Sequence, residues 1–254
     1  MLPIVSTPHP SPRSTVATIW IIARRGALEA LRDRSTVLTA VFFAIVFPFF
    51  LVQSIVQPAV ADPKQSAQIG SILATLLLTA GLLNTSAAVG IASGVFVGEK
   101  EKGNLLPLLA TPASNFAIFG GKILSAVLPA MLFALTAQVA FLIETAIFIN
   151  LDTLLKLAII PAFASVVLVP TLALFTATIA SIISSRVRTF NAAQTIGGII
   201  LLPLWFGLIA LTGAALRWGI GVVFLTIVLL LLADMGLIIL GARTWRREEV
   251  LAQQ

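Results

Sequence analysis

The chain has 254 residues, of which 59% are hydrophobic and only 10% are charged, with a mean hydropathy of +1.07. About a quarter of the residues of an ordinary soluble domain are charged, so this composition excludes a water-solvated protein and predicts an all-α integral membrane protein. The net charge of +6 does not indicate a nucleic-acid partner, because the basic residues form short clusters between apolar runs rather than one basic face.

The N-terminal segment has two parts. Residues 1–14 are rich in Pro and Ser and lack the charged start and apolar core of a signal peptide, so we expect a disordered cytoplasmic tail. Residues 15–36 are predicted to form an amphipathic helix, with Trp20 and Ala27 on one side and Arg25 on the other. Such a basic helix suits the headgroup layer of a membrane, and a cytoplasmic extension of the first span is the alternative.

Six apolar segments are long enough to cross the hydrocarbon core, which takes about 20 residues of helix. In chain order they are Val37–Gln57, Ile69–Val97, Ile123–Ile149, Leu157–Ser184, Ala193–Gly213 and Gly219–Gly241. The fifth segment contains GGIILLPLWFG, which also fits a bent or partly re-entrant span. We therefore predict a six-helix transmembrane domain over residues 37–241 and a cytoplasmic C-terminal tail over residues 242–254.

The distribution of Lys and Arg predicts the orientation of these spans. Thirteen of them fall in one set of loops and ends, and only Lys64, Lys156 and Arg217 fall in the opposite set. Cytoplasmic loops carry the excess of basic residues, so both termini are expected to be cytoplasmic in a multi-pass protein of the cell membrane. The external loops are short and leave no room for a folded external domain.

The connection between the second and third spans, residues 98–122, is the most polar part of the chain's centre. It reads GEKEKGNLLPLLATPASNFAIFGGK, in which a run of charges precedes a Leu-rich turn and a Thr-Pro pair. An apolar helix exposed in the cytoplasm is a liability unless it lies against headgroups or a partner protein. The candidate contact residues are Glu99, Lys100, Glu101, Lys102, Gly103, Leu105, Leu108, Leu109, Thr111 and Pro112. Membrane anchoring by an interfacial loop is the plain alternative.

This stretch resembles the signature of the type-2 membrane subunits of ATP-binding-cassette exporters. In that family an acidic-basic run, a Gly and a Leu-rich turn precede a Thr/Ser-Pro pair and, further on, a Gly-Lys pair. The matching residues are Glu99, Glu101, Gly103, Leu105, Leu108, Leu109, Thr111, Pro112, Gly121 and Lys122. The chain departs from the pattern at Asn104, where Thr is usual, and at Leu106, where an acidic residue is common.

Two further stretches extend the resemblance to nearly the whole chain. EALRDRST, before the first span, is similar to the corresponding segment of the sodium-efflux-like branch, and SSRVRTFNAAQTIGGIILLPLWF is similar to the region that leads into the fifth span. The resemblance implies a permease whose coupling loop, residues 98–122, docks on a separate ATPase subunit. It further implies that Leu105–Leu109 sit in a groove on that subunit and that the charges of residues 99–102 form salt bridges at its rim.

The resemblance also implies that two half-transporters pair, for which a homodimer is the simplest assumption and a homologous permease the alternative. The cargo it allows is an amphiphile, a lipid-like molecule, a drug or sodium. Membrane lipids surround the assembly, and nucleic acid is not an expected partner.

No nucleotide or metal site is expected in this chain. It has no G-x-x-x-x-G-K-[ST] phosphate loop: before the FGGK that ends at Lys122, Phe116 replaces the first Gly, and Ile123 replaces the hydroxyl residue. The chain has no cysteine, and its single histidine, His9, lies in the tail, so no metal-ligand cluster is predicted. We therefore expect no cofactor on this chain, with ATP and Mg²⁺ held by the partner ATPase.

Four polar residues inside the predicted spans are candidates for a transport pathway, namely Asn84, Gln138, Glu144 and Asp234. A charged group at such depth costs about 2.5–3.5 kcal/mol on insertion scales, so each carboxylate is expected to face a partner, a cavity or water. Structural alternatives stay open, because Glu144 lies near the membrane surface and Asp234 fits a hydrogen bond to another helix.

Two other functions belong to different classes. A mechanotransmitter, which signals conformational change without transport, would normally need a sizeable external domain. An integral membrane enzyme that modifies lipids would gather carboxylates or histidines at one membrane face, whereas the acidic residues here are scattered. Both fit the sequence less well than a permease.

Overall fold

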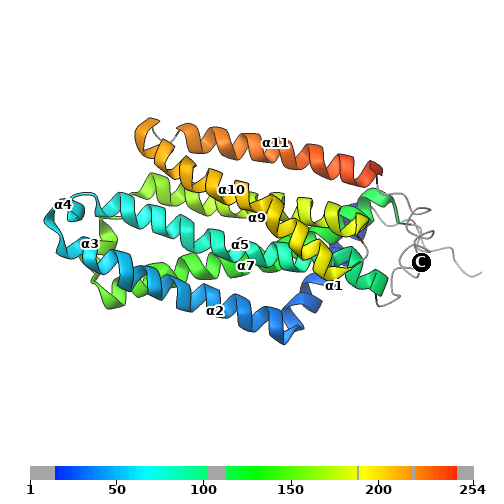
Figure 1. Cartoon of the computed structure of the whole chain (residues 1–254), viewed down its shortest axis with the longest axis horizontal. Helices are drawn as coiled ribbons and strands as arrows, with labels where there is room; N and C mark the ends of the chain where they lie inside the picture. Colours follow the sequence, from blue (N-terminus) through cyan, green and yellow to red (C-terminus); the bar gives the residue numbers. More distant parts are fainter. Residues whose placement is uncertain (1–14, 102–112, 188, 219–220, 245–254) are drawn as a thin grey trace, which may run out of the picture.

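The computed structural model describes residues 15–101, 113–187, 189–218 and 221–244, and every element in these ranges is helical (Figure 1). In chain order the elements are α1 (Thr15–Arg32), α2 (Arg34–Leu51), the π-helical turn η1 (Val52–Val56), α3 (Gln57–Ala61), α4 (Pro63–Ser66), α5 (Ile69–Glu101), α7 (Asn115–Phe148), α8 (Leu151–Leu155), α9 (Ile159–Arg186), α10 (Phe190–Trp218) and α11 (Gly221–Thr244). The predicted tail over residues 1–14, the centre of the coupling loop over residues 102–112 and residues 245–254 lie outside the described ranges.

Five helical segments of the described chain are long and apolar enough to cross a membrane: Arg34–Ala61, Ile69–Glu99, Asn115–Phe148, Ile159–Arg186 and Gly221–Arg243. They correspond to the first four predicted spans and the sixth, so the prediction of an all-helical, multi-pass chain is confirmed. The fifth predicted segment lies within α10, which runs as one helix through Pro203. A total of six spans stays a prediction.

Several predicted boundaries differ from the structure. α5 continues through Glu101 and α7 begins at Asn115, so both ends of the predicted coupling loop belong to long helices. The predicted amphipathic helix over residues 15–36 ends at Arg32 instead, and the Asp33 side chain accepts a hydrogen bond from the Thr36 N–H and caps α2. Residues 34–36 therefore begin the helix of the first span, because Asp33 satisfies one of its free N–H groups.

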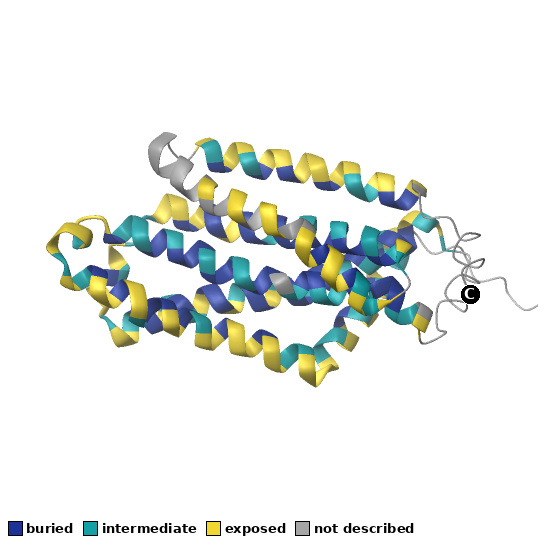
Figure 2. Ribbon diagram, in the orientation of Figure 1, coloured by how far each residue is buried: buried dark blue, intermediate teal, exposed yellow. Residues whose placement is uncertain are grey.

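α5, α7 and α9 form the centre of the bundle, with α2 below them and α11 above them in Figure 1. α5 is the most buried of the five candidate spans, and the outward faces of α2 and α11 are exposed (Figure 2). Small side chains line the contact of α5 with α9, including Ala88 and Ala92 on α5 and Ala173, Ala177 and Ala180 on α9. Such residues let helix backbones approach closely, which is how helices associate where no water drives them together.

α1 is docked on the first half of α7, with Ala23 buried in the contact. Two glycines make the close approach possible. A Cβ atom on Gly121 of α7 would lie 2.8 Å from the Cβ of Ile22, and one on Gly26 of α1 would lie 2.6 Å from the Cβ of Ser125. The face of α1 opposite Ala23 and Gly26 therefore points away from the bundle.

This packing predicts different effects for two adjacent glycines of α7. Gly121→Val is expected to destabilise the chain by about 1–3 kcal/mol, because a side chain there overlaps α1. Gly120→Val is the matched control, since nothing lies within 4 Å of a Cβ at that position. Thermal unfolding of the purified chain in detergent measures both. Equal unfolding temperatures for the two variants would contradict the docking of α1 on Gly121.

Candidate functional site

Polar contacts converge at the end of the bundle where α5 ends and α7 begins, on the right in Figure 1. Glu99, on the last turn of α5, forms an ion pair with Lys122 of α7. The pair is partly buried, with 28% of the Glu99 side chain and 12% of the Lys122 side chain exposed. It joins the two helices that residues 102–112 connect in sequence.

The final residue of α5 reaches α10. The Glu101 carboxylate accepts a hydrogen bond from the Phe190 N–H at 3.1 Å, and the Thr189 hydroxyl accepts one from the Ala192 N–H at 3.3 Å. The first N–H groups of a helix have no partner within the helix, and the helix dipole favours a negative charge beside them. Glu101 therefore acts as a cap that one helix supplies to the start of another.

A buried serine joins α5 to the end of α9. The Ser184 hydroxyl donates to the Ser93 carbonyl at 2.6 Å and accepts from the N–H groups of Phe96 and Val97 at 3.3 and 3.2 Å. Ser184 is fully buried, so these bonds form where water does not compete for them. The last turns of α5 are thus bonded to α7, α9 and α10.

Sequence reasoning placed only part of this cluster. The prediction that Glu99 and Glu101 contact a partner stays a prediction, and in the structure both carboxylates also have partners within the chain. Docking by residues 102–112, and by the Lys100 side chain, lies outside the described residues and stays a prediction. The sequence analysis does not identify Ser93 and Ser184 as site residues. The pattern that would have indicated them is a serine within an otherwise apolar helix, because hydroxyl groups there commonly form hydrogen bonds between helices.

Two candidate pathway residues lie in the centre of the bundle, between α5, α7 and α9. The Asn84 amide donates to the Ala80 carbonyl at 3.3 Å, within α5. The Gln138 amide of α7 lies 3.4 Å from the Leu77 carbonyl of α5 and 3.5 Å from the Ser165 hydroxyl of α9. The amide oxygens of Asn84 and Gln138 are buried and have no hydrogen-bond partner among the described residues. Gln138 thus links α7 to α5 and α9, whereas Asn84 bonds only within α5, and both amide oxygens are free to accept a further hydrogen bond.

The two candidate carboxylates lie far from each other. Both Glu144 on α7 and Asp234 on α11 are buried. Gly241 of α11 lies beside Phe119 of α7, so the rise of 1.5 Å per helical residue separates the carboxylates by roughly 25 Å along the bundle. The structure therefore does not bring all four candidate pathway residues into one site.

Comparison with known proteins agrees with this architecture. Residues 17–207, which span most of the chain from α1 into α10, match the family described as ABC-2 type transporter. No curated protein matches the chain.

Proposed function

The chain belongs to the ABC-2 type transporter family, and from that membership we propose that it is the permease subunit of an ATP-binding-cassette exporter. A membrane domain of this family is a transport component without a catalytic site of its own, and it lies in a membrane as a multi-pass protein. We propose further that a separate ATPase subunit binds ATP and Mg²⁺, and that hydrolysis there drives export through this chain.

The contacts at the end of α5 support this coupling. Residues 102–112 join α5 to α7 in sequence, so a partner that pushes on them moves the end of α5 and the start of α7. Lys122, Ser184 and the start of α10 are bonded to that end, so the movement passes to three further helices. Packed helices move as rigid bodies, which is how a small displacement at one end opens or closes a pathway between them.

The basic residues support a cytoplasmic position for this end of the bundle. The described residues near it include Arg24, Arg25, Arg32, Arg34, Lys122, Arg186 and Arg243, whereas Lys64 and Lys156 lie near the opposite end. Cytoplasmic segments carry the excess of Lys and Arg, so we assign the loop and both termini to the cytoplasm of a cell-membrane protein.

A second copy of the chain, or a homologous permease, completes the proposed pathway. The exposed apolar faces of α2 and α11 offer surface for such a partner and for lipid. The proposed cargo is an amphiphile, a lipid-like molecule, a drug or sodium, with sodium favoured only by the resemblance of EALRDRST to the sodium-efflux-like branch. Mechanotransmission is the second candidate, and the short connections through α4 and α8 at the far end favour transport over it.

Cysteine cross-linking tests the proposal directly, because the chain has no cysteine of its own. We expect Leu108→Cys to cross-link to an ATP-binding-cassette ATPase that is encoded beside the chain and co-purifies with it. Leu155→Cys is the control: this side chain is exposed on α8 at the opposite end, so it should react with an impermeant maleimide from outside the cell. Labelling of Leu108→Cys from outside, or purification without any such ATPase, would contradict the proposal.

A further inference from the structure

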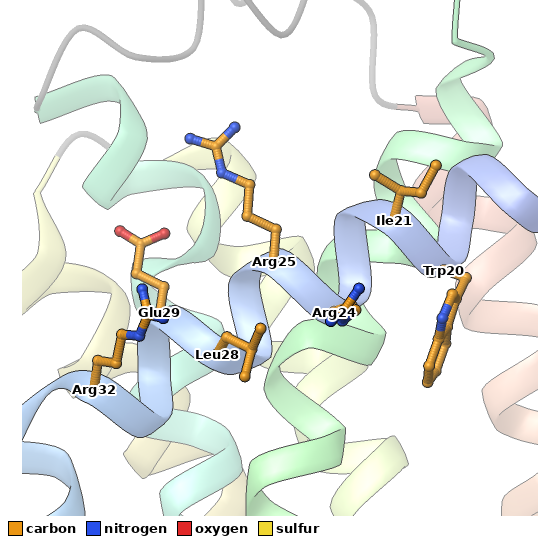
Figure 3. Close-up of a pocket in the computed structure, with 7 residues that line it drawn as sticks. All are labelled: Trp20, Ile21, Arg24, Arg25, Leu28, Glu29 and Arg32. Carbon is orange, nitrogen blue, oxygen red and sulfur yellow. The ribbon is translucent and has the colours of Figure 1, made fainter.

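The face of α1 that points away from α7 combines arginines with exposed apolar side chains. Figure 3 shows two rows along the helix, one of Trp20, Arg24 and Leu28 and the other of Ile21, Arg25 and Glu29. These side chains and Arg32, all of them on α1, border an open space of about 550 Å³ between them, which is called the groove below. Trp20, Ile21 and Leu28 are 56%, 46% and 43% exposed, so three large apolar side chains lie exposed on the same face as the arginines.

The groove carries an excess of positive charge. Three arginines line it against one carboxylate, that of Glu29. Glu29 is four residues after Arg25 and three before Arg32, so it neighbours both on the helix surface and reduces only part of their charge. Guanidinium groups match the geometry of phosphate oxygens and form two parallel hydrogen bonds with them. The groove is therefore complementary to a phosphate group with apolar chains attached.

The position of α1 favours a lipid as the source of that phosphate. α1 is fixed to α7 at Gly121 and Ser125, in the early turns of a membrane-spanning helix, and it leads directly into α2. Trp side chains concentrate at the boundary between headgroups and hydrocarbon, and a basic helix with an apolar row lies in that layer. A soluble phosphate compound without apolar chains would make no favourable contact with Ile21 and Leu28.

We propose that this groove is a binding site for an anionic phospholipid of the leaflet in which α1 lies. The positive charges of Arg24, Arg25 and Arg32 attract the anionic headgroup, while Ile21 and Leu28 lie beside the first carbons of the acyl chains. The proposal does not require the ATPase partner, so it and the coupling proposal fail separately.

The fluorescence of Trp20 gives a direct readout. The probe chain is full length and carries Trp205→Phe, Trp218→Phe and Trp245→Phe, so Trp20 is its only tryptophan. It is reconstituted in phosphatidylcholine vesicles that contain brominated phosphatidylglycerol or, at equal mole fraction, brominated phosphatidylcholine. We expect stronger quenching by the brominated anionic lipid, with a preference that decreases as salt screens the charges.

Replacement of arginines separates a specific site from general membrane contact. Each of Arg24→Gln, Arg25→Gln and Arg32→Gln is expected to lower the lipid preference roughly fivefold, as one basic group near an anionic surface contributes. The triple Arg→Lys variant should keep most of the preference, and Arg186→Gln and Arg243→Gln, which change exposed arginines outside the groove, should leave it unchanged.

Four results would overturn the proposal. The first is equal quenching by the two brominated lipids, and the second is a preference that survives the triple Arg→Gln change in a chain of normal helicity. The third is displacement of the lipid by millimolar inorganic phosphate, which would identify a soluble anion as the ligand. Absence of quenching by either lipid, together with cross-linking from position 20 to the ATPase, would equally overturn it in favour of a protein partner.

Discussion

Replacement of Lys122 by glutamate is expected to remove the stimulation of ATP hydrolysis that we propose this chain gives to a separate ATPase, while the chain still inserts in the membrane. The Glu99 carboxylate would then face a second carboxylate, introduced at position 122, in a partly buried place between α5 and α7. Loss of a charged hydrogen bond there costs about 2 kcal/mol. This corresponds to a roughly thirtyfold decrease in the population of the conformation in which α5 and α7 are held together at this end. ATP turnover of the purified complex in liposomes measures the effect.

The exchanged pair gives the decisive control for Lys122. Glu99→Lys combined with Lys122→Glu restores opposite charges on the same two helices, so it is expected to recover most of the stimulated turnover. Arg243→Glu reverses a charge at the same end of the bundle outside the pair and should have little effect. Normal turnover in Lys122→Glu, or failure of the exchanged pair to recover it, would show that the ion pair does not couple the helices.

The long helices could be predicted from the sequence because the membrane imposes one requirement on length and polarity. The hydropathy predicts a span over Leu157–Ser184, and α9 occupies Ile159–Arg186. Hydropathy could not predict where helices continue beyond the hydrocarbon. α5 runs on through the charged residues after Val97, since Glu99 and Glu101 find partners in Lys122 and the Phe190 N–H.

The contacts of the candidate site depend on tertiary structure that no local pattern contains. Ser184 bonds to Ser93, 91 residues earlier in the chain, and nothing in either neighbourhood indicates the other. In the sequence, Gly121 is recognisable only as part of a Gly-Lys pair. In the structure, its lack of a side chain is what allows α1 to pack closely against α7. Which face of a uniformly apolar helix is buried follows from its neighbours, because in lipid both faces can be apolar.

Replacement of Asp234 is expected to raise the stability of the chain and to lower its transport activity. Along α11 the buried positions Val223, Ile227, Leu230, Asp234 and Gly241 form one stripe toward the bundle, so the carboxylate faces α9 and α7 rather than lipid. Both of its oxygens are buried and have no hydrogen-bond partner among the described residues. A carboxylate kept only for structure would be expected to have such a partner.

Asp234→Leu is therefore expected to raise the thermal stability of the chain and to abolish transport. Removal of an unsatisfied buried polar group is favourable by about 1–3 kcal/mol, whereas a leucine cannot carry a charge or bind a cation. Thermal unfolding in detergent measures the first effect. The second is measured as ATP-dependent flux in vesicles for radioactive sodium, a fluorescent phospholipid and a fluorescent hydrophobic cation.

Met235→Leu, on the exposed face one residue later, is the matched control and should change neither stability nor flux. Lower stability of Asp234→Leu would make the carboxylate a structural group, and undiminished flux in a stable variant would remove Asp234 from the pathway.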